Sequence, residues 1–178
     1  MKAGSSGSAG ISLPELNELD RDGFVARLGA IYEHSPWVAA GAWPERPFES
    51  VETLWYAMQS AVEAATRTRQ LGLIRAHPEL AGRLAVAGQL TEASRREQAG
   101  AGLDRCTPAE FTLLQELNAA YHDRFDLPFV VAVRGLTPGD IIARLAQRLV
   151  NRPDEELATC LHEIGRIARF RLQDLVRE

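Results

Sequence analysis

The chain has 178 residues, a formal net charge of -4 and a pI near 5.6, with 46% apolar and 25% charged residues. These values are typical of one soluble domain that is long enough to bury a core. They give no basis for binding nucleic acid or an anionic membrane, and no stretch approaches the roughly 20 apolar residues of a membrane span. Two cysteines, Cys106 and Cys160, are too few for a disulfide framework and indicate a reducing cytoplasm.

Residues 1–10 are rich in glycine and serine and are expected to be a disordered leader or an expression remnant, so the domain is expected to span residues 11–178. From there on, polar caps and apolar spacing predict one helix after another. The helices are expected to begin at or just after the following residues: Ser12, Asp20, Ser50, Thr91, Thr107, Thr137 and Asn151. The second helix should end at Ser35-Pro36-Trp37, and the helix after Ser50 should reach toward Leu71.

Residues 127–133 interrupt the helical pattern with the run Leu-Pro-Phe-Val-Val-Ala-Val. Their β-branched and aromatic side chains favour a buried strand. No second run offers itself as a partner, so we predict one extended segment threaded through a helical core. The expected fold class is all-α, a single-domain helical bundle.

His77 is the first residue with a candidate chemical role. It precedes Pro78, which disfavours a helical backbone at position 77 and places the histidine at the end of an element. Histidine there is well placed to move protons. A surface or capping histidine is the alternative.

Ser94, Glu97 and Gln98 follow one another at the spacing of a single helical face. A hydroxyl, a carboxylate and an amide on one face suit a ureido or amide ligand. The spacing Ser-x-x-Glu is also that of a capping box. If Thr91 is the true N-cap, the cluster lies in the second turn and its polarity needs another reason.

Arg171 lies within the apolar stripe of the final helix. That stripe comprises Leu157, Leu161, Ile164, Ala168 and Leu175. A cation among apolar residues is costly without an anionic partner. Either Arg171 pairs with an internal carboxylate, or it reaches into a site for an anionic or carbonyl-bearing substrate.

The inventory of the chain also limits its chemistry. Lys2 is the only lysine and lies in the Gly/Ser-rich start, so a Schiff base with substrate or pyridoxal phosphate is not expected. His162-Glu163 lacks the second histidine of a zincin motif, and no cluster has metal-ligand spacing. Catalysis is therefore expected to use His, Glu and Arg alone.

Taken together, several motifs resemble the 2-oxo-4-hydroxy-4-carboxy-5-ureidoimidazoline (OHCU) decarboxylase family from about Leu13 to Val176. They comprise Ser35-Pro36-Trp37, Arg46-Pro47-Phe48, Leu73 to Leu80, Ser94-x-x-Glu97-Gln98-Ala99-Gly100, Leu117-Asn118-x-x-Tyr121, Phe125-x-x-Pro128-Phe129 and Arg169-Phe170-Arg171-Leu172. The order and spacing of these motifs are specific. The family usually has Phe-Gly-Phe-Pro-Phe where this chain has Asp126 and Leu127 as the middle pair.

The resemblance implies an all-α enzyme that decarboxylates OHCU to (S)-allantoin, the last step from urate, without a cofactor. It implies His77 and Glu97 as catalytic residues. It implies a substrate-binding set of Pro78, Ser94, Gln98, Phe129, Val131 and Arg171, with Arg171 favoured over Arg169 by the apolar stripe. It further implies a cytoplasmic homodimer with a functional link to hydroxyisourate hydrolase and uricase.

Two other functions remain open from the residues themselves. One is a ureide hydrolase that opens the allantoin ring on the same scaffold, and measuring CO2 release against ring opening separates it from a decarboxylase. The other is a non-catalytic helical binding module in which His77 and the Ser94 cluster are caps. Such a module should keep its function when His77 and Glu97 are both replaced.

Overall fold

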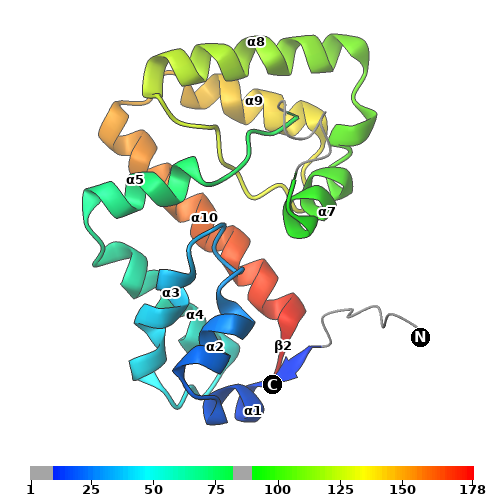
Figure 1. Cartoon of the computed structure of the whole chain (residues 1–178). Coiled ribbons are helices and arrows are strands. Elements are labelled where there is room, and N and C mark those ends of the chain that lie inside the picture. Colours follow the sequence, from blue (N-terminus) through cyan, green and yellow to red (C-terminus); the bar gives the residue numbers. More distant parts are fainter. Residues whose placement is uncertain (1–9, 82–89) are drawn as a thin grey trace, which may run out of the picture. The chain divides into compact units, whose positions relative to one another are not determined.

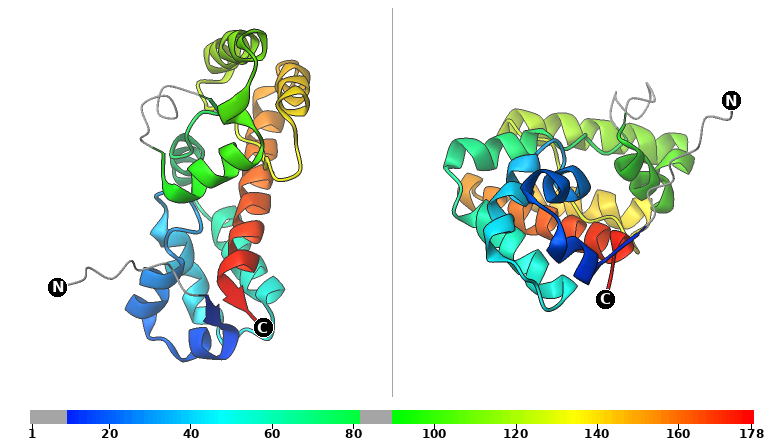
Figure 2. Two further views of the ribbon diagram at one scale, coloured as in Figure 1. Left: turned by 90° about the vertical axis from the view of Figure 1, so that its right-hand side faces the viewer. Right: turned by 60° about the horizontal axis from the view of Figure 1, so that its bottom comes forward.

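The computed structural model describes residues 10–81 and 90–178, and these are mainly helical, which confirms the all-α fold class (Figure 1). The longer elements are α1 (Leu13–Glu18), α2 (Arg21–Leu28), α3 (Pro36–Ala42), α4 (Val51–Glu63), α5 (Arg67–Arg75), α7 (Glu92–Gly100), α8 (Pro108–Phe125), α9 (Pro138–Arg148) and α10 (Pro153–Leu175). Two short 3-10 turns are η1 (Trp43–Glu45) and η2 (Leu103–Arg105). The strands β1 (Ile11–Ser12) and β2 (Val176–Arg177) pair in parallel beside the C-terminus, with Ile11 opposite Val176 (Figure 2).

The chain divides into two compact units. The first contains the residues up to Gln70 together with Gly165–Glu178, and the second contains Leu71–Ile164. Both α5 and α10 contribute residues to each unit. The expected domain boundaries, a leader over 1–10 and one domain over 11–178, stay a prediction, and all of the leader except Gly10 lies outside the described residues.

Six of the seven predicted helix starts are confirmed by a side-chain cap, and Asn151 is the exception. These residues accept a hydrogen bond from the backbone N–H three residues later: Ser12, Asp20, Ser50, Thr91, Thr107 and Thr137. Each thereby satisfies one of the amides that a helix leaves unpaired at its start. Helix α10 begins at Pro153, two residues after Asn151.

Two helix ends differ from expectation. Helix α2 stops at Leu28, and Ser35-Pro36-Trp37 begins α3 instead of only ending the previous helix. The reason lies at Gly29, where an added Cβ would lie 2.6 Å from the Val25 carbonyl oxygen and 3.1 Å from the Pro36 Cβ. This close approach requires glycine and turns the chain.

The helix after Ser50 also ends early, at Glu63. The Gln70 amide donates to the Val62 carbonyl at 3.0 Å, and Thr66 accepts from the Arg69 N–H at 3.4 Å. The Gln70 side chain thus caps the C-terminal end of α4, and Thr66 caps the N-terminal end of α5. The single expected helix toward Leu71 is therefore two helices.

The first unit is built around α2, α3 and α4. Its core contains Phe24, Leu28, Leu54 and Met58, all without exposed surface. Tight packing continues at Gly165 of α10, where an added Cβ would meet the Gln59 side chain at 2.8 Å. Gly165 also accepts a 2.8 Å hydrogen bond from the Trp55 indole at its carbonyl.

The second unit contains the predicted irregular segment. Residues 128–133 have no helix or strand assignment, and Phe129–Val133 are all buried. The segment connects the end of α8 to the start of α9, as the yellow trace of Figure 1 shows. The prediction of a buried, non-helical segment without a strand partner is therefore confirmed for the described residues.

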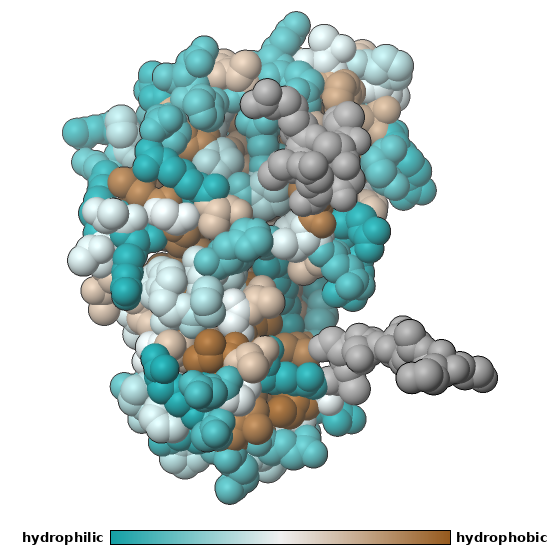
Figure 3. All heavy atoms as spheres, viewed as in Figure 1, coloured by the Kyte–Doolittle hydropathy of each residue, from teal (hydrophilic) through white to brown (hydrophobic). Residues whose placement is uncertain are grey.

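The surface is mostly hydrophilic on the face seen in Figure 3, where hydrophobic residues form small separate patches. Large apolar side chains with substantial exposure are scattered along the chain: Tyr56, Phe111, Leu113 and Val150. Among the described residues, the helices are each too short or too polar to span a lipid bilayer.

Candidate active site

His77 lies two residues after the end of α5, as the His-Pro pair predicts. Its backbone N–H donates to the Ile74 carbonyl at 3.1 Å, and its side chain is buried. The ring atom Nδ1 lies 3.0 Å from the Leu73 carbonyl oxygen. Because a carbonyl only accepts, Nδ1 must carry the proton in this bond, and Nε2 is then the basic nitrogen of the neutral ring.

The turn after His77 is held by three amide side chains. Asn118 of α8 donates to the Leu80 carbonyl at 3.0 Å, and Gln115 donates to the Ala81 carbonyl at 2.7 Å. Gln98 of α7 accepts from the Ala81 N–H at 3.0 Å. Ala81 has a positive φ of 51°, a conformation that persists when surrounding contacts enforce it. Two helices therefore fix the backbone just beyond the histidine.

Thr91, not Ser94, is the N-cap of α7, which decides between the two interpretations of the Ser94 cluster. Thr91 Oγ1 accepts from the Ser94 N–H and donates to the Ser94 hydroxyl at 3.1 Å. Glu97 and Gln98 consequently lie in the second turn. Ser94 and Gln98 are buried and Glu97 is half-buried. The polar face is not a capping box, so its burial requires another reason.

Gln98 presents a defined hydrogen-bonding group. Its Oε1 is occupied by the Ala81 N–H, and its NH2 group makes no hydrogen bond to another described residue. The chemistry that this NH2 group can offer is that of a hydrogen-bond donor.

The segment 127–133 lies against the same face of α8 as the turn after His77. Tyr121 contacts the Phe129 ring edge-on at 5.3 Å, while Asn118, three residues earlier on α8, binds Leu80. Three helical residues span about 4.5 Å along the axis. The turn after His77 thus contacts α7 through Gln98 and α8 through Asn118, and α8 contacts Phe129 through Tyr121.

Asp126 shows why the family pattern has glycine at this position. Its φ is 53°, in the left-handed region where glycine is favoured and aspartate is tolerated. Arg75 Nη2 contacts the Asp126 carboxylate at 2.5 Å. The departure from the family pattern therefore keeps the backbone turn and adds an exposed ion pair.

Two buried charged residues, absent from the sequence-based site, bind the backbone of this segment. Arg148 Nη1 donates to the Val130 carbonyl at 2.7 Å, and Glu163 Oε2 accepts from the Ala132 N–H at 2.7 Å. Arg148 follows Ile141 and Leu145 on the buried stripe of α9. An arginine on an apolar stripe is the same signal that singled out Arg171, and it would have found Arg148.

A buried network supports Arg148. Glu156 accepts from Arg148 Nε at 2.8 Å, from Arg148 Nη2 at 2.5 Å and from the Tyr121 hydroxyl. The Arg148 guanidinium also lies over the Phe129 ring at 4.6 Å. Burial raises the pKa of the Tyr121 phenol and of the Cys160 thiol, so both keep their protons at neutral pH.

Arg171 belongs to the other unit. Its Nη1 donates to Glu33 Oε2 at 2.9 Å and to the Ile31 carbonyl at 3.3 Å, and both charged side chains are buried. The internal carboxylate partner is therefore present, and a substrate-binding role for Arg171 stays a prediction. Arg169 instead contacts Glu52 at 2.8 Å on the surface.

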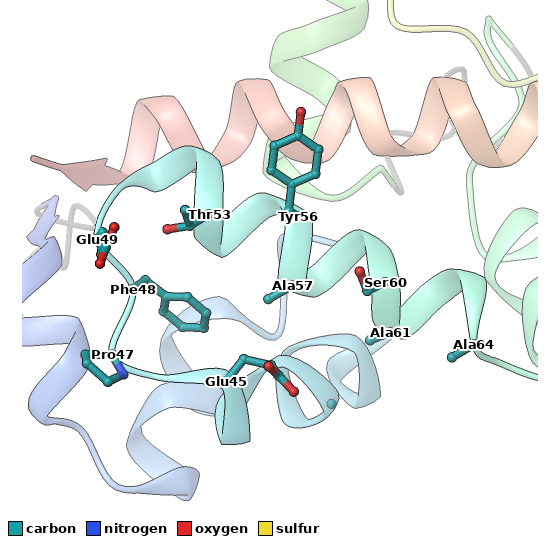
Figure 4. A pocket seen from close by; sticks show the side chains of 11 residues that line it. Glu45, Pro47, Phe48, Glu49, Thr53, Tyr56, Ala57, Ser60, Ala61 and Ala64 are labelled. Carbon is teal, nitrogen blue, oxygen red and sulfur yellow. The ribbon is translucent and has the colours of Figure 1, made fainter.

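An open groove of about 630 Å³ in the first unit contains none of the predicted site residues. It is lined by Ala57, Ala61 and Ala64 on one side of α4 and by the loop that carries Glu45 and Glu49 (Figure 4). Two carboxylates and no cation make it unsuited to an anionic substrate. In the described ranges there is also no cluster of three metal-binding side chains.

Comparisons with known proteins point to one family. The OHCU decarboxylase family model matches residues 17–173. A 2-oxo-4-hydroxy-4-carboxy-5-ureidoimidazoline decarboxylase of Haloferax volcanii is 44% identical over 92% of this chain and 95% of its own length. A uric acid degradation bifunctional protein of Bacillus sp. (strain TB-90) is 40% identical over 93% of this chain, which spans 32% of that protein. A crystal structure of (S)-allantoin synthase matches with a TM-score of 0.76 and 27% identity, over 93% of this chain and 54% of that one.

Proposed function

Since this chain belongs to the OHCU decarboxylase family, we propose that it removes CO2 from 2-oxo-4-hydroxy-4-carboxy-5-ureidoimidazoline to give (S)-allantoin in urate degradation. The enzyme is then a carboxy-lyase. The observation that carries the proposal is the buried His77 with one ring nitrogen committed to Leu73, next to a turn held by Gln98. This geometry suits a proton-transfer residue beside a ligand-binding amide.

The substrate needs little chemical help from a cofactor. Its carboxylate is attached to a carbon next to a ring C=N bond. When the C–C bond to the carboxylate breaks and CO2 leaves, the electron pair moves toward that C=N bond. The protein must then supply orientation, a poorly solvated place for the carboxylate and a proton on one face. No lysine adduct or metal is required for these tasks.

The residues take the following roles in this proposal. His77 is the general acid and base, and Nε2 exchanges the proton at the hydroxyl-bearing side of the substrate. Glu97 is the second catalytic residue, and with Gln98 it holds the ureido group. Ser94 adds a hydroxyl to the same face. The walls of the binding site are made by Pro78, Phe129 and Val131.

Arg171 completes the proposed set by binding a carbonyl or the negative charge that develops during decarboxylation. Its Nη1 donates to Glu33 Oε2 at 2.9 Å. Support comes from its position in the late Arg-Phe-Arg-Leu motif.

The first experiment forms the labile substrate from urate with uricase and hydroxyisourate hydrolase and follows allantoin by circular dichroism. Spontaneous decay gives racemic allantoin. A fast rise of the (S) enantiomer on adding the protein is the expected result. A well-folded sample that leaves the racemic course unchanged would contradict the proposal, and ring opening of allantoin without CO2 release would indicate the hydrolase instead.

We further propose a cytoplasmic homodimer that acts directly after hydroxyisourate hydrolase and uricase. The bifunctional uric acid degradation relative supports a link to neighbouring steps of the pathway. Cys106 and Cys160 are free thiols, which suits a reducing compartment. Light scattering on the purified protein should give twice the chain mass of 19.6 kDa.

A further inference from the structure

The buried segment that follows α8 poses a problem of hydrogen bonding. Backbone N–H and C=O groups away from water need partners, and a lone extended segment finds none in a sheet. In this chain two of the partners are side chains. Arg148 donates to the Val130 carbonyl, and Glu163 accepts from the Ala132 N–H, each at 2.7 Å. The cost of burying these charges indicates that the position of this segment matters.

We propose that Arg148 and Glu163 are positioning residues for catalysis, which bind the backbone on either side of Val131 and thereby hold Phe129 and Val131 against the substrate. The inference rests on the proposed function, because it requires that this segment line the decarboxylase site. Arg148 and Glu163 themselves need not touch the substrate.

Variants of Glu163 test the proposal most directly. Glu163→Gln keeps an oxygen that accepts from Ala132, whereas Glu163→Leu removes it. Glu163→Asp keeps the charge but withdraws the oxygen by about one bond length, so it serves if the leucine variant does not fold. We expect Glu163→Gln to keep kcat/KM within about threefold, and the Leu and Asp variants to lose about 10- to 100-fold, chiefly as a higher KM.

A destabilised control separates positioning from folding. Ile141→Val removes a buried methyl group from α9, a change that lowers the melting temperature and keeps the bonds of Arg148 and Glu163 to the segment. It should leave kcat and KM at the values of the parent protein. Amide hydrogen exchange at Ala132 should be faster in Glu163→Leu and nearly unchanged in Glu163→Gln.

The outcomes distinguish this inference from the proposed function. If the parent protein does not decarboxylate the substrate, the proposed function is overturned and the positioning role with it. If the parent is active and Glu163→Leu or Glu163→Asp retains kcat/KM within about threefold with only a lower melting temperature, the positioning role alone is overturned.

Discussion

At His77 one hydrogen bond decides what the side chain offers. The Leu73 carbonyl lies one helical turn earlier in the sequence and holds Nδ1 at 3.0 Å. In the proposed mechanism, Nε2 is therefore the nitrogen that gains and loses the proton. The side chain is buried, which suits proton transfer to a substrate more than exchange with bulk water.

Replacing this histidine should remove general acid and base help while leaving the backbone turn in place. We expect His77→Ala to lower kcat by about 10²–10⁴-fold, the usual worth of such help. The circular dichroism assay measures the loss, and the far-UV spectrum with the melting temperature checks the fold. A loss of less than tenfold in a folded variant would remove His77 from the catalytic role.

The KM for the substrate should depend on whether the side chain at position 98 carries an NH2 donor or a second oxygen. In Gln98→Glu one carboxylate oxygen still accepts from Ala81, but the NH2 donor becomes a second negatively charged oxygen. We expect KM to rise about 10- to 100-fold, with the loss of a charge-assisted hydrogen bond as the cause. An unchanged KM would show that this amide only supports the turn. Glu116→Gln, at an exposed site on α8, is the control for a Glu/Gln exchange and should leave KM unchanged.

At the scale of the element, helix starts are stabilised by hydrogen bonds between residues three positions apart. At α8 the Thr107 N–H and hydroxyl both donate to Glu110 Oε2 at 2.9 Å, and Glu110 N–H donates back to Thr107 Oγ1 at 3.2 Å. These bonds favour the ionised carboxylate and lower the pKa of Glu110 below its usual value.

A cap of this kind makes helix stability depend on pH. The contribution of Glu110 is present above the pKa that the residue has in the unfolded chain, and it is lost as the pH falls through the lowered pKa of the folded state. Thr107→Ala should lower the free energy of unfolding by about 0.5–2 kcal/mol at neutral pH and by less in acid, and it should raise the pKa of Glu110. NMR titration of Glu110 and urea unfolding at both pH values measure this. Thr112→Ala, on the exposed side of α8, should leave the pKa of Glu110 unchanged.

On the scale of the molecule, buried charges concentrate where irregular backbone must be held. Glu156 has no exposed surface and accepts from Arg148, Tyr121 and Asn151. These partners come from α8, α9 and the loop before α10. The second unit thus uses polar contacts in its core, although helical bundles usually fill that space with apolar side chains.

Breaking this network should lower the free energy of unfolding because it leaves a buried charge without its partner. Glu156→Gln leaves the buried Arg148 guanidinium without its anion, and we expect the free energy of unfolding to fall by about 3–5 kcal/mol. Chemical denaturation measures the change. Glu116→Gln should change stability by no more than about 0.5 kcal/mol. Similar small effects for both variants would mean that the network does not support the fold.

Much of the helical framework could be predicted because its determinants are local. The caps at Thr91, Thr107 and Thr137 act on amides three residues away, and the His77-Pro78 pair restricts its own backbone. The failed predictions were helix ends. Gly29 packs against Pro36, and Gln70 caps α4 from the next helix, so both ends depend on contacts beyond the local pattern.

The sequence by itself determined the fold class, most helix starts, the His77 turn and the polar face of Ser94 and Gln98, because these follow from residues within a few positions of one another. Only the tertiary structure decided which backbone groups meet Asn118, Arg148 and Glu163. Asn118 and Leu80 lie 38 residues apart, and Glu163 and Ala132 lie 31 apart. Apolar periodicity shows which residues are buried, but it carries no information about which buried carbonyl or amide a distant polar side chain will reach.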